Sequence, residues 1–197
     1  MAAAATCPLF LGLETRVNEL KEKFIRDQIE AEAADPSFFA DLDRLAAFRL
    51  LVHAEIEEFL ENKATEGLNT LESSFKQGSQ AIRANLGLLV VGAMLGKVAK
   101  FDAPQWDMYL TEVVAAARLT VQENNGIKER SFLQLAVFSG KMPDETDVAL
   151  SSALTAYGKS RGDVAHKSVK RVRNIRAPSA ESKDADDLIA GLRGFFC

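Results

Sequence analysis

The stretch DLDRLAAFRLLVHAEIEEFLEN, residues 41–62, decides the fold class. Apolar side chains recur in it at steps of three or four, which places them on one face of an α-helix. They are Leu45, Phe48, Val52, Ile56 and Phe59. Charged residues fill the other faces. The spacing predicts a helix over residues 38–62 that buries this one stripe.

The same periodicity appears on both sides of this stretch. It predicts further helices over residues 10–33, 79–102, 104–123, 128–139 and 144–157. Four prolines fall where one pattern stops and another starts, namely Pro36, Pro104, Pro143 and Pro178. No stretch alternates with period two for long enough to indicate a strand. The sequence predicts an all-α antiparallel helical bundle.

The two ends of the chain are expected to lie outside this bundle. Residues 1–9 lack the basic segment of a secretory signal and are expected to form a loose lead-in to a domain of residues 10–176. Residues 177–187, APSAESKDADD, show no periodicity and predict a linker. The apolar residues that follow, to residue 197, are expected to form a short helix or tail that docks either on the bundle or on a partner.

Composition narrows the classes of function. A chain of 197 residues with 47% hydrophobic and 26% charged side chains has the make-up of one globular domain. Its net charge of −4 gives no general reason to bind nucleic acid. The most apolar internal stretch has ten residues, 86–95, whereas a membrane span needs ~20. We therefore expect no membrane partner, and the two distant cysteines, Cys7 and Cys197, fit a reducing cytoplasm.

One stretch departs from the acidic average: GKSRGDVAHKS, residues 158–168, with the basic residues that follow it. From residue 159 to residue 176, seven basic side chains stand against the single acid Asp163. Ser160 and Asp163 have the spacing of a capping box, which predicts that a new helix begins at Ser160. Because a helix N-terminus carries partial positive charge and free N–H groups, the segment is expected to bind a polyanion.

Arg161 and His166 within this segment are the candidate catalytic residues. Histidine titrates in the range needed to take a proton from a 2′-hydroxyl or to protonate a leaving oxygen. Arginine offers a planar fork of donors to a phosphate whose charge grows in the transition state. The candidate RNA-backbone binders are Lys159, Lys167, Lys170, Arg171 and Arg173. No metal and no other cofactor is expected, because two histidines leave no convincing set of metal ligands.

Helical geometry restricts how this pair can act. Five residues along a helix turn the chain by ~500°, so the side chains of Arg161 and His166 point ~140° apart. One copy of the helix cannot aim both at one point unless Arg161 swings forward off the helix end.

Arg161-x4-His166, late in an all-α chain, resembles the R-x4-6-H signature of HEPN domains. Three wider runs are similar to the RiboL-PSP-HEPN subgroup: LLVHAEIEEFLENKA (50–64), NNGIKERSFLQLAVFSG (124–140) and YGKSRGDVAHKS (157–168). The likeness covers roughly residues 10–175.

HEPN proteins are small helical bundles that dimerise so that two copies of the motif face each other across a shared cleft. Many are metal-independent endoribonucleases, often in toxin–antitoxin or phage-defence systems. The resemblance implies a homodimer that cleaves single-stranded RNA with Arg161 and His166 of both subunits, leaving a 2′,3′-cyclic phosphate and a 5′-hydroxyl. It also implies an antitoxin or other regulatory protein as a partner. A second copy of the motif would remove the angular restriction.

Several alternatives stay open. Many HEPN motifs carry a polar residue directly after the arginine, where this sequence has Gly162, so the alternative function is a non-catalytic HEPN-like module that binds a partner protein, RNA or nucleotide. A purely structural dimer held by Arg161 and His166 is a third. His166 can also be a half-buried residue bonded to a neighbouring helix, and the basic run can be a solvated face that pairs with glutamates such as Glu55, Glu57 and Glu58.

Four polar residues are predicted to support the site: Ser160, Asp163, His53 and Glu57. His53 and Glu57 lie four residues apart and so share one helix face. They form either a polar pair near the site or an edge-of-core histidine with a salt-bridge partner.

Overall fold

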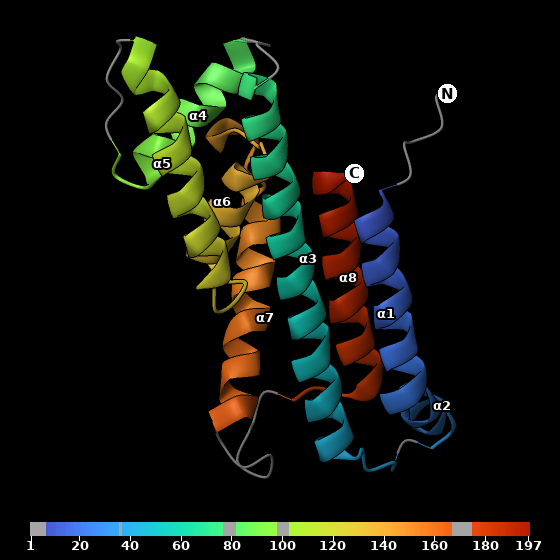
Figure 1. Ribbon diagram of the computed structural model, residues 1–197. Coiled ribbons are helices and arrows are strands. Elements are labelled where there is room, and N and C mark those ends of the chain that lie inside the picture. Colours follow the sequence, from blue (N-terminus) through green and yellow to red (C-terminus); the bar gives the residue numbers. More distant parts are fainter. Residues whose placement is uncertain (1–6, 36, 77–81, 98–102, 167–174) are drawn as a thin grey trace. The chain divides into compact units, whose positions relative to one another are not determined.

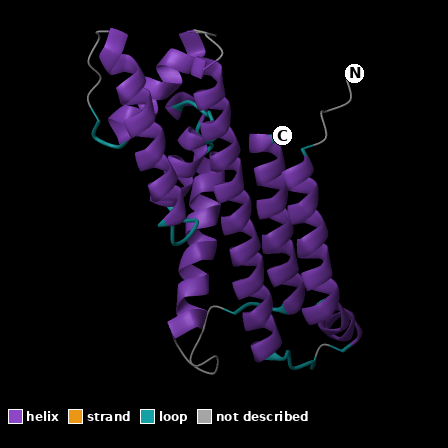
Figure 2. Ribbon diagram, viewed as in Figure 1, coloured by secondary structure: helices purple, strands orange, loops and turns teal. Residues whose placement is uncertain are grey.

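The computed structural model describes residues 7–35, 37–76, 82–97, 103–166 and 175–197, without the side chains of residues 82, 83, 103, 104 and 163–166. Across these ranges all regular structure is helical and no strand occurs (Figures 1 and 2), which confirms the predicted all-α class. The elements are α1 (Pro8–Phe24), α2 (Arg26–Ala34), α3 (Leu42–Lys76), α4 (Ile82–Met94), α5 (Ala103–Gln122), α6 (Glu129–Phe138), the 3₁₀ turn η1 (Pro143–Glu145), α7 (Val148–His166) and α8 (Pro178–Phe196).

The chain divides into two compact units. Unit 1 comprises Met1–Phe59, Gly126–Glu129 and Asp147–Cys197, so it contains α1, α2, α7, α8 and the first half of α3. Unit 2 comprises Leu60–Asn125 and Arg130–Thr146, with the second half of α3, α4, α5 and most of α6. The Arg161 motif belongs to unit 1.

The predicted stripe of α3 is buried as expected. Its five apolar residues are all at most 4% exposed. Asp41 caps the helix, because its side chain accepts the N–H groups of Asp43 and Arg44 at 3.1 Å. The helix runs to Lys76, past the predicted end at residue 62. This extension contains Gly67, which packs directly against the backbone of α6. A Cβ at Gly67 would stand 2.3 Å from the carbonyl oxygen of Phe138, so this close approach requires glycine.

The helix predicted over residues 10–33 is interrupted. α1 ends at Phe24 and α2 begins at Arg26, with Ile25 between them in a non-helical conformation and fully buried. The buried side chain of Gln28 stabilises this break, since its amide donates to the Phe24 carbonyl and its oxygen accepts the N–H of Asp41. Periodicity continues through the break, so the sequence pattern did not reveal it.

In unit 2, α4 is shorter than predicted. The N–H of Lys97 bonds to the Gly92 carbonyl and that of Gly96 to the Ala93 carbonyl, while Gly96 has φ +68°. This is a Schellman motif, which ends the helix at a glycine that the sequence prediction passed over. Gly92 also packs against Tyr109 of α5, since a Cβ at Gly92 would overlap the Tyr109 hydroxyl.

Two predictions about the candidate motif are wrong. The helix predicted over residues 144–157 does not end at Gly158, and no new helix begins at Ser160, because α7 runs unbroken from Val148 to His166. Asp147 caps this helix, accepting the N–H of Leu150 at 2.9 Å. Ser160 and Asp163 are therefore interior helix positions and do not form a capping box. The positive end of a helix does not lie at the motif.

The linker predicted over residues 177–187 is also wrong. Pro178 is the first residue of α8, which extends to Phe196 and belongs to unit 1. Its Glu181 is fully buried and forms a two-pronged ion pair with Arg49 of α3, through Nε at 3.1 Å and through Nη2. Glu181, one of the polar residues that suggested a linker, therefore forms a buried contact between α8 and α3.

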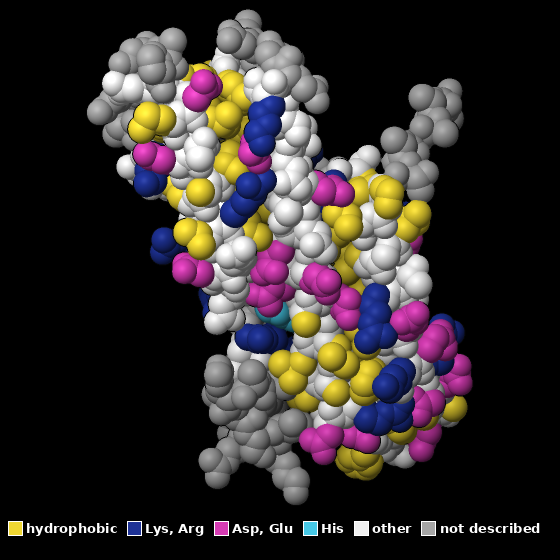
Figure 3. Space-filling view, viewed as in Figure 1, with side chains coloured by type: hydrophobic (Ala, Val, Ile, Leu, Met, Phe, Trp, Pro, Cys, Tyr) yellow, Lys and Arg dark blue, Asp and Glu magenta, His cyan; other side chains and the backbone are white. Residues whose placement is uncertain are grey.

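The surface over α1 and α2 carries interspersed basic and acidic side chains (Figure 3). They form exposed ion pairs, namely Arg16–Glu19, Arg26–Glu22 and Arg44–Asp27. Such pairs contribute little to stability. Among the described helices, none has the length and apolar content needed to cross a membrane.

We predict that the buried pair stabilises unit 1 strongly. Glu181→Gln removes the carboxylate that pairs with the buried Arg49 and should lower the free energy of unfolding by about 3–5 kcal/mol. Urea unfolding measures this loss. The matched control is Lys183→Met, which removes the exposed Lys183–Asp187 pair and should change stability by less than about 0.5 kcal/mol. Equal effects of the two substitutions would contradict the assigned role.

Candidate functional site

The candidate site in unit 1 is built around His53 of α3. The ring lies one helical turn beyond Arg49 and is 2% exposed. Among the described residues, its Nδ1 is buried and has no hydrogen-bond partner. Oε2 of Glu57 stands 3.6 Å from this Nδ1, beyond hydrogen-bond distance. The core therefore holds an incompletely satisfied imidazole, which is uncommon for a buried polar group.

A short loop that ends at Glu129, the first residue of α6, lies next to this histidine. The N–H of Gly126, which has φ +128°, donates to Oε1 of Glu57. Ile127 is fully buried and anchors the loop. At the other end, the N–H of Glu129 donates to the Thr155 hydroxyl of α7 at 2.8 Å. The loop is thus fixed to α3 and to α7, and it presents the exposed Lys128 between them.

Gly158 brings the backbone of α7 close to the loop and the histidine. A Cβ at this position would stand 3.2 Å from Cγ of Lys128 and 3.7 Å from Nε2 of His53. The glycine therefore serves close packing within a helix, and this is why it does not end the helix as the sequence suggested. The Nε2 edge of the His53 ring lies near Gly158 of α7, whereas Nδ1 lies near Glu57.

Arg161 completes the cluster, one turn beyond Gly158 on α7 and half-buried. Burial lowers the pKa of His53 to about 4, and the positive charges of Arg161 and Lys128 contribute to this lowering. His53 is therefore neutral near pH 7, and its contact with Glu57 is not an ion pair. We refer to His53, Glu57, Lys128 and Arg161 as the His53 cluster.

Three predicted site residues meet in this cluster: His53, Glu57 and Arg161. The sequence analysis missed Lys128, because a single lysine in a loop carries no pattern. In the sequence, only Gly126, two residues before Lys128, indicates a turn at this place.

Other predicted residues lie elsewhere. Lys159 is exposed, and the described residues give it no hydrogen bond or ion pair. Asp163 and His166 belong to α7, but their side chains lie outside the described part of the structure, as do all atoms of four predicted RNA-backbone binders, Lys167, Lys170, Arg171 and Arg173. Of the glutamates considered as partners for the basic run, Glu55 pairs with Arg16 at 3.0 Å and Glu57 binds the Gly126 N–H.

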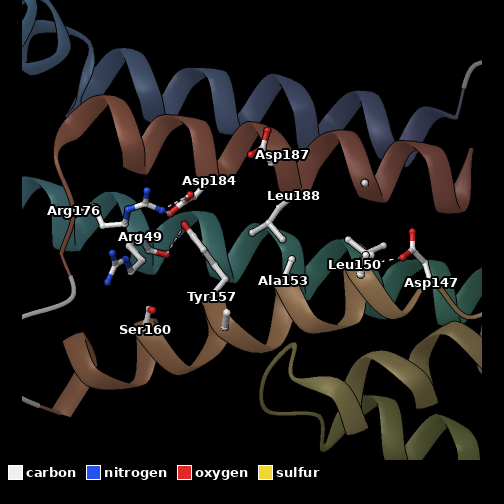
Figure 4. A pocket seen from close by; sticks show the side chains of 13 residues that line it. Arg49, Asp147, Leu150, Ala153, Tyr157, Ser160, Arg176, Asp184, Asp187 and Leu188 are labelled. Atoms are coloured by element: carbon white, nitrogen blue, oxygen red, sulfur yellow. Dashed lines mark hydrogen bonds and ion pairs between the residues drawn. The ribbon is translucent and has the colours of Figure 1, made fainter.

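Ser160 lines a groove of about 760 Å³ in unit 1 (Figure 4). Arg49, Tyr157 and Arg176 border its polar end, where Arg176 and Asp184 point toward each other (Figure 4). The Arg176 guanidinium donates to the Asp184 carboxylate at 2.8 Å. The Tyr157 hydroxyl lies 3.5 Å from the Arg49 carbonyl oxygen, and burial raises the pKa of that phenol. Toward the other end the lining includes Leu150, Ala153, Leu188 and Gly191, together with Asp147 (Figure 4).

Within the ranges that the structure describes, no group of three or more histidine, cysteine, aspartate or glutamate side chains is arranged to hold a metal ion. Comparison with models of protein families, with curated proteins and with solved structures finds no match for this chain.

We predict that His53 makes folding sensitive to acid. Its folded pKa of about 4 lies below the ordinary value of 6.5, so the unfolded chain binds the proton more readily. The stabilisation from neutral His53 is complete above about pH 6.5 and is lost as the pH falls toward 4. By pH 4.5 the loss should reach about 2–3 kcal/mol relative to pH 7.

Urea unfolding at both pH values measures this loss. His53→Gln should remove that part of the pH dependence, and the control His166→Gln should retain it if only the buried ring is responsible. An unchanged pH dependence in His53→Gln would show that other groups cause the acid sensitivity.

Proposed function

We propose that this protein is a metal-independent endoribonuclease of HEPN type, acting on single-stranded RNA through a composite Arg161/His166 site at a homodimer interface. His166 acts as the general acid or base on the 2′-hydroxyl and the leaving oxygen. Arg161 binds the scissile phosphate and stabilises the charge that develops on it. The products carry a 2′,3′-cyclic phosphate and a 5′-hydroxyl.

The observation that carries the proposal is the environment of Arg161. Its charge acts on the buried His53, and the described residues offer it no carboxylate partner. An arginine without a counterion, next to a second cation at Lys128, favours an anionic ligand. The all-helical fold and the Arg-x4-His spacing agree with the family resemblance.

The continuous α7 strengthens the argument for two subunits. Arg161 lies inside the helix and cannot swing off its end, so the ~140° between it and His166 is imposed by helical geometry. A second copy of the chain supplies the partner residue at each site. The phosphate affinity expected from a helix N-terminus is not part of the proposal, because the helix begins at Val148.

The alternative is a non-catalytic module that binds a partner protein, RNA or nucleotide. Two observations favour it: Gly162 follows the arginine, and the groove that includes Ser160 lies on the same helix. This module would bind RNA or a partner stably without cutting the strand.

A denaturing gel of single-stranded RNA incubated with the protein in excess EDTA tests the proposal. The unmutated protein should yield fragments that end in cyclic phosphate. His166→Ala and Arg161→Ala should each reduce the cleavage rate by about 100-fold or more, because each loses a group that acts in the transition state.

The matched control is Arg26→Ala, which removes an exposed arginine paired with Glu22 in unit 1 and should leave the rate unchanged. Intact RNA with folded protein and several substrates would refute the nuclease and favour the binding module. Equal cleavage by the unmutated protein and His166→Ala would trace the fragments to another enzyme in the preparation.

A further inference from the structure

Lys128 and Arg161 are two cations that approach one imidazole from different elements. Lys128 comes from the loop that ends at Glu129 and Arg161 from α7. Within the described structure neither makes a hydrogen bond or an ion pair, although both act electrostatically on His53. Two cations beside one buried ring, with no carboxylate partner among the described residues, favour an anionic ligand.

The framework holding these cations is rigid. Glu57 and Thr155 fix the loop at its two ends, and the buried Ile127 anchors its centre. The absence of a side chain at Gly158 lets α7 pass close to Cγ of Lys128. Lys128 is thus presented beside the helix that carries Arg161, with little backbone freedom to move away.

The imidazole beneath them is an unpartnered polar group. His53 is 2% exposed, and its Nδ1 lacks a hydrogen bond among the described residues. Among the residues that the structure describes, the charged groups near this ring are Glu57 from α3, Arg161 from α7 and Lys128. The two cations disfavour a proton on the ring. Burial is the larger cause of the lowered pKa of His53, and an anion bound to the cations would remove their part of it, so protonation would become less unfavourable with Glu57 beside Nδ1.

We propose that Lys128 and Arg161 form a binding site for a tetrahedral oxyanion, the phosphate of a nucleotide or of RNA, and that His53 takes up a proton when this site fills. Lys128 is then a phosphate-binding residue, and His53 is a positioning residue that couples occupancy to pH. The inference rests on the proposed function for the identity of the natural anion, whereas anion binding itself is independent of cleavage.

The coupling has a definite sign. If bound anion favours protonated His53, then protonated His53 must favour bound anion to the same extent, because linkage is reciprocal. Anion affinity should therefore rise as the pH falls from 7 toward 4. The magnitude is about tenfold for each pH unit by which the midpoint of the His53 titration moves.

Proton NMR of the two histidines, with and without sulfate at constant ionic strength, tests the proposal. Sulfate is the probe because it is a tetrahedral oxyanion that does not titrate in this range. His166→Gln leaves His53 as the single histidine and makes the assignment direct. Saturating sulfate should move the His53 midpoint from about 4 to about 5 or higher.

Lys128→Gln should weaken sulfate binding about tenfold or more and abolish the sulfate-dependent movement of the midpoint. The matched control is Lys183→Gln, which removes an exposed lysine of α8 outside the His53 cluster. It should preserve both effects. A midpoint unaffected by saturating sulfate, or equally affected in Lys128→Gln and the unmutated protein, would overturn the proposal.

This experiment separates the two proposals. A sulfate response in a protein that leaves RNA intact would support the anion site and refute the nuclease. RNA cleavage without a sulfate response would support the nuclease and refute the coupling to His53.

Discussion

The ion pair between Arg49 and Glu181 is the interaction on which unit 1 depends. It joins α3 to α8 with both charges almost fully buried, and the N–H of Arg176 donates to the same carboxylate at 2.8 Å. The Tyr157 hydroxyl of α7 lies 3.5 Å from the Arg49 carbonyl oxygen, so α7 also contacts α3 at Arg49. Because two buried charges are costly unless paired, these helices have one favourable arrangement and few alternatives.

The His53 cluster lies one helical turn beyond this junction. His53 follows Arg49 by four residues on α3, and Arg161 follows Tyr157 by four on α7. The contact between the Tyr157 hydroxyl and the Arg49 carbonyl therefore relates the two helices that carry His53 and Arg161. The result is a neutral, buried imidazole with Glu57 near its Nδ1 and with two cations, Lys128 and Arg161, acting on it. Such an arrangement combines a pH-sensitive group with a demand for an anion, and active sites characteristically contain perturbed groups of this kind.

Local patterns predicted the helices but not their special contacts. The stripe of α3 was readable because burial on one face dictates its spacing, and α5 and α6 were placed nearly to their observed ends. The roles of the glycines could not be predicted in this way. Gly158 permits close packing inside α7, whereas Gly96 ends α4, and only the contacts with neighbouring residues distinguish the two cases. Likewise Glu181 looked like a linker residue because its partner lies 132 residues away. Lys128 had no signal, since its position depends on contacts with Glu57 and Thr155.

The central claim is that one functional site needs Arg161 from one subunit and His166 from the other. Mixing Arg161→Ala with His166→Ala, each inactive alone, tests it most directly once subunit exchange has been verified. Half of the dimers should be mixed, and each mixed dimer should contain one intact site of two, so RNA cleavage should return to about one quarter of the unmutated rate. A mixture that exchanges subunits and stays inactive would contradict a site shared in this way.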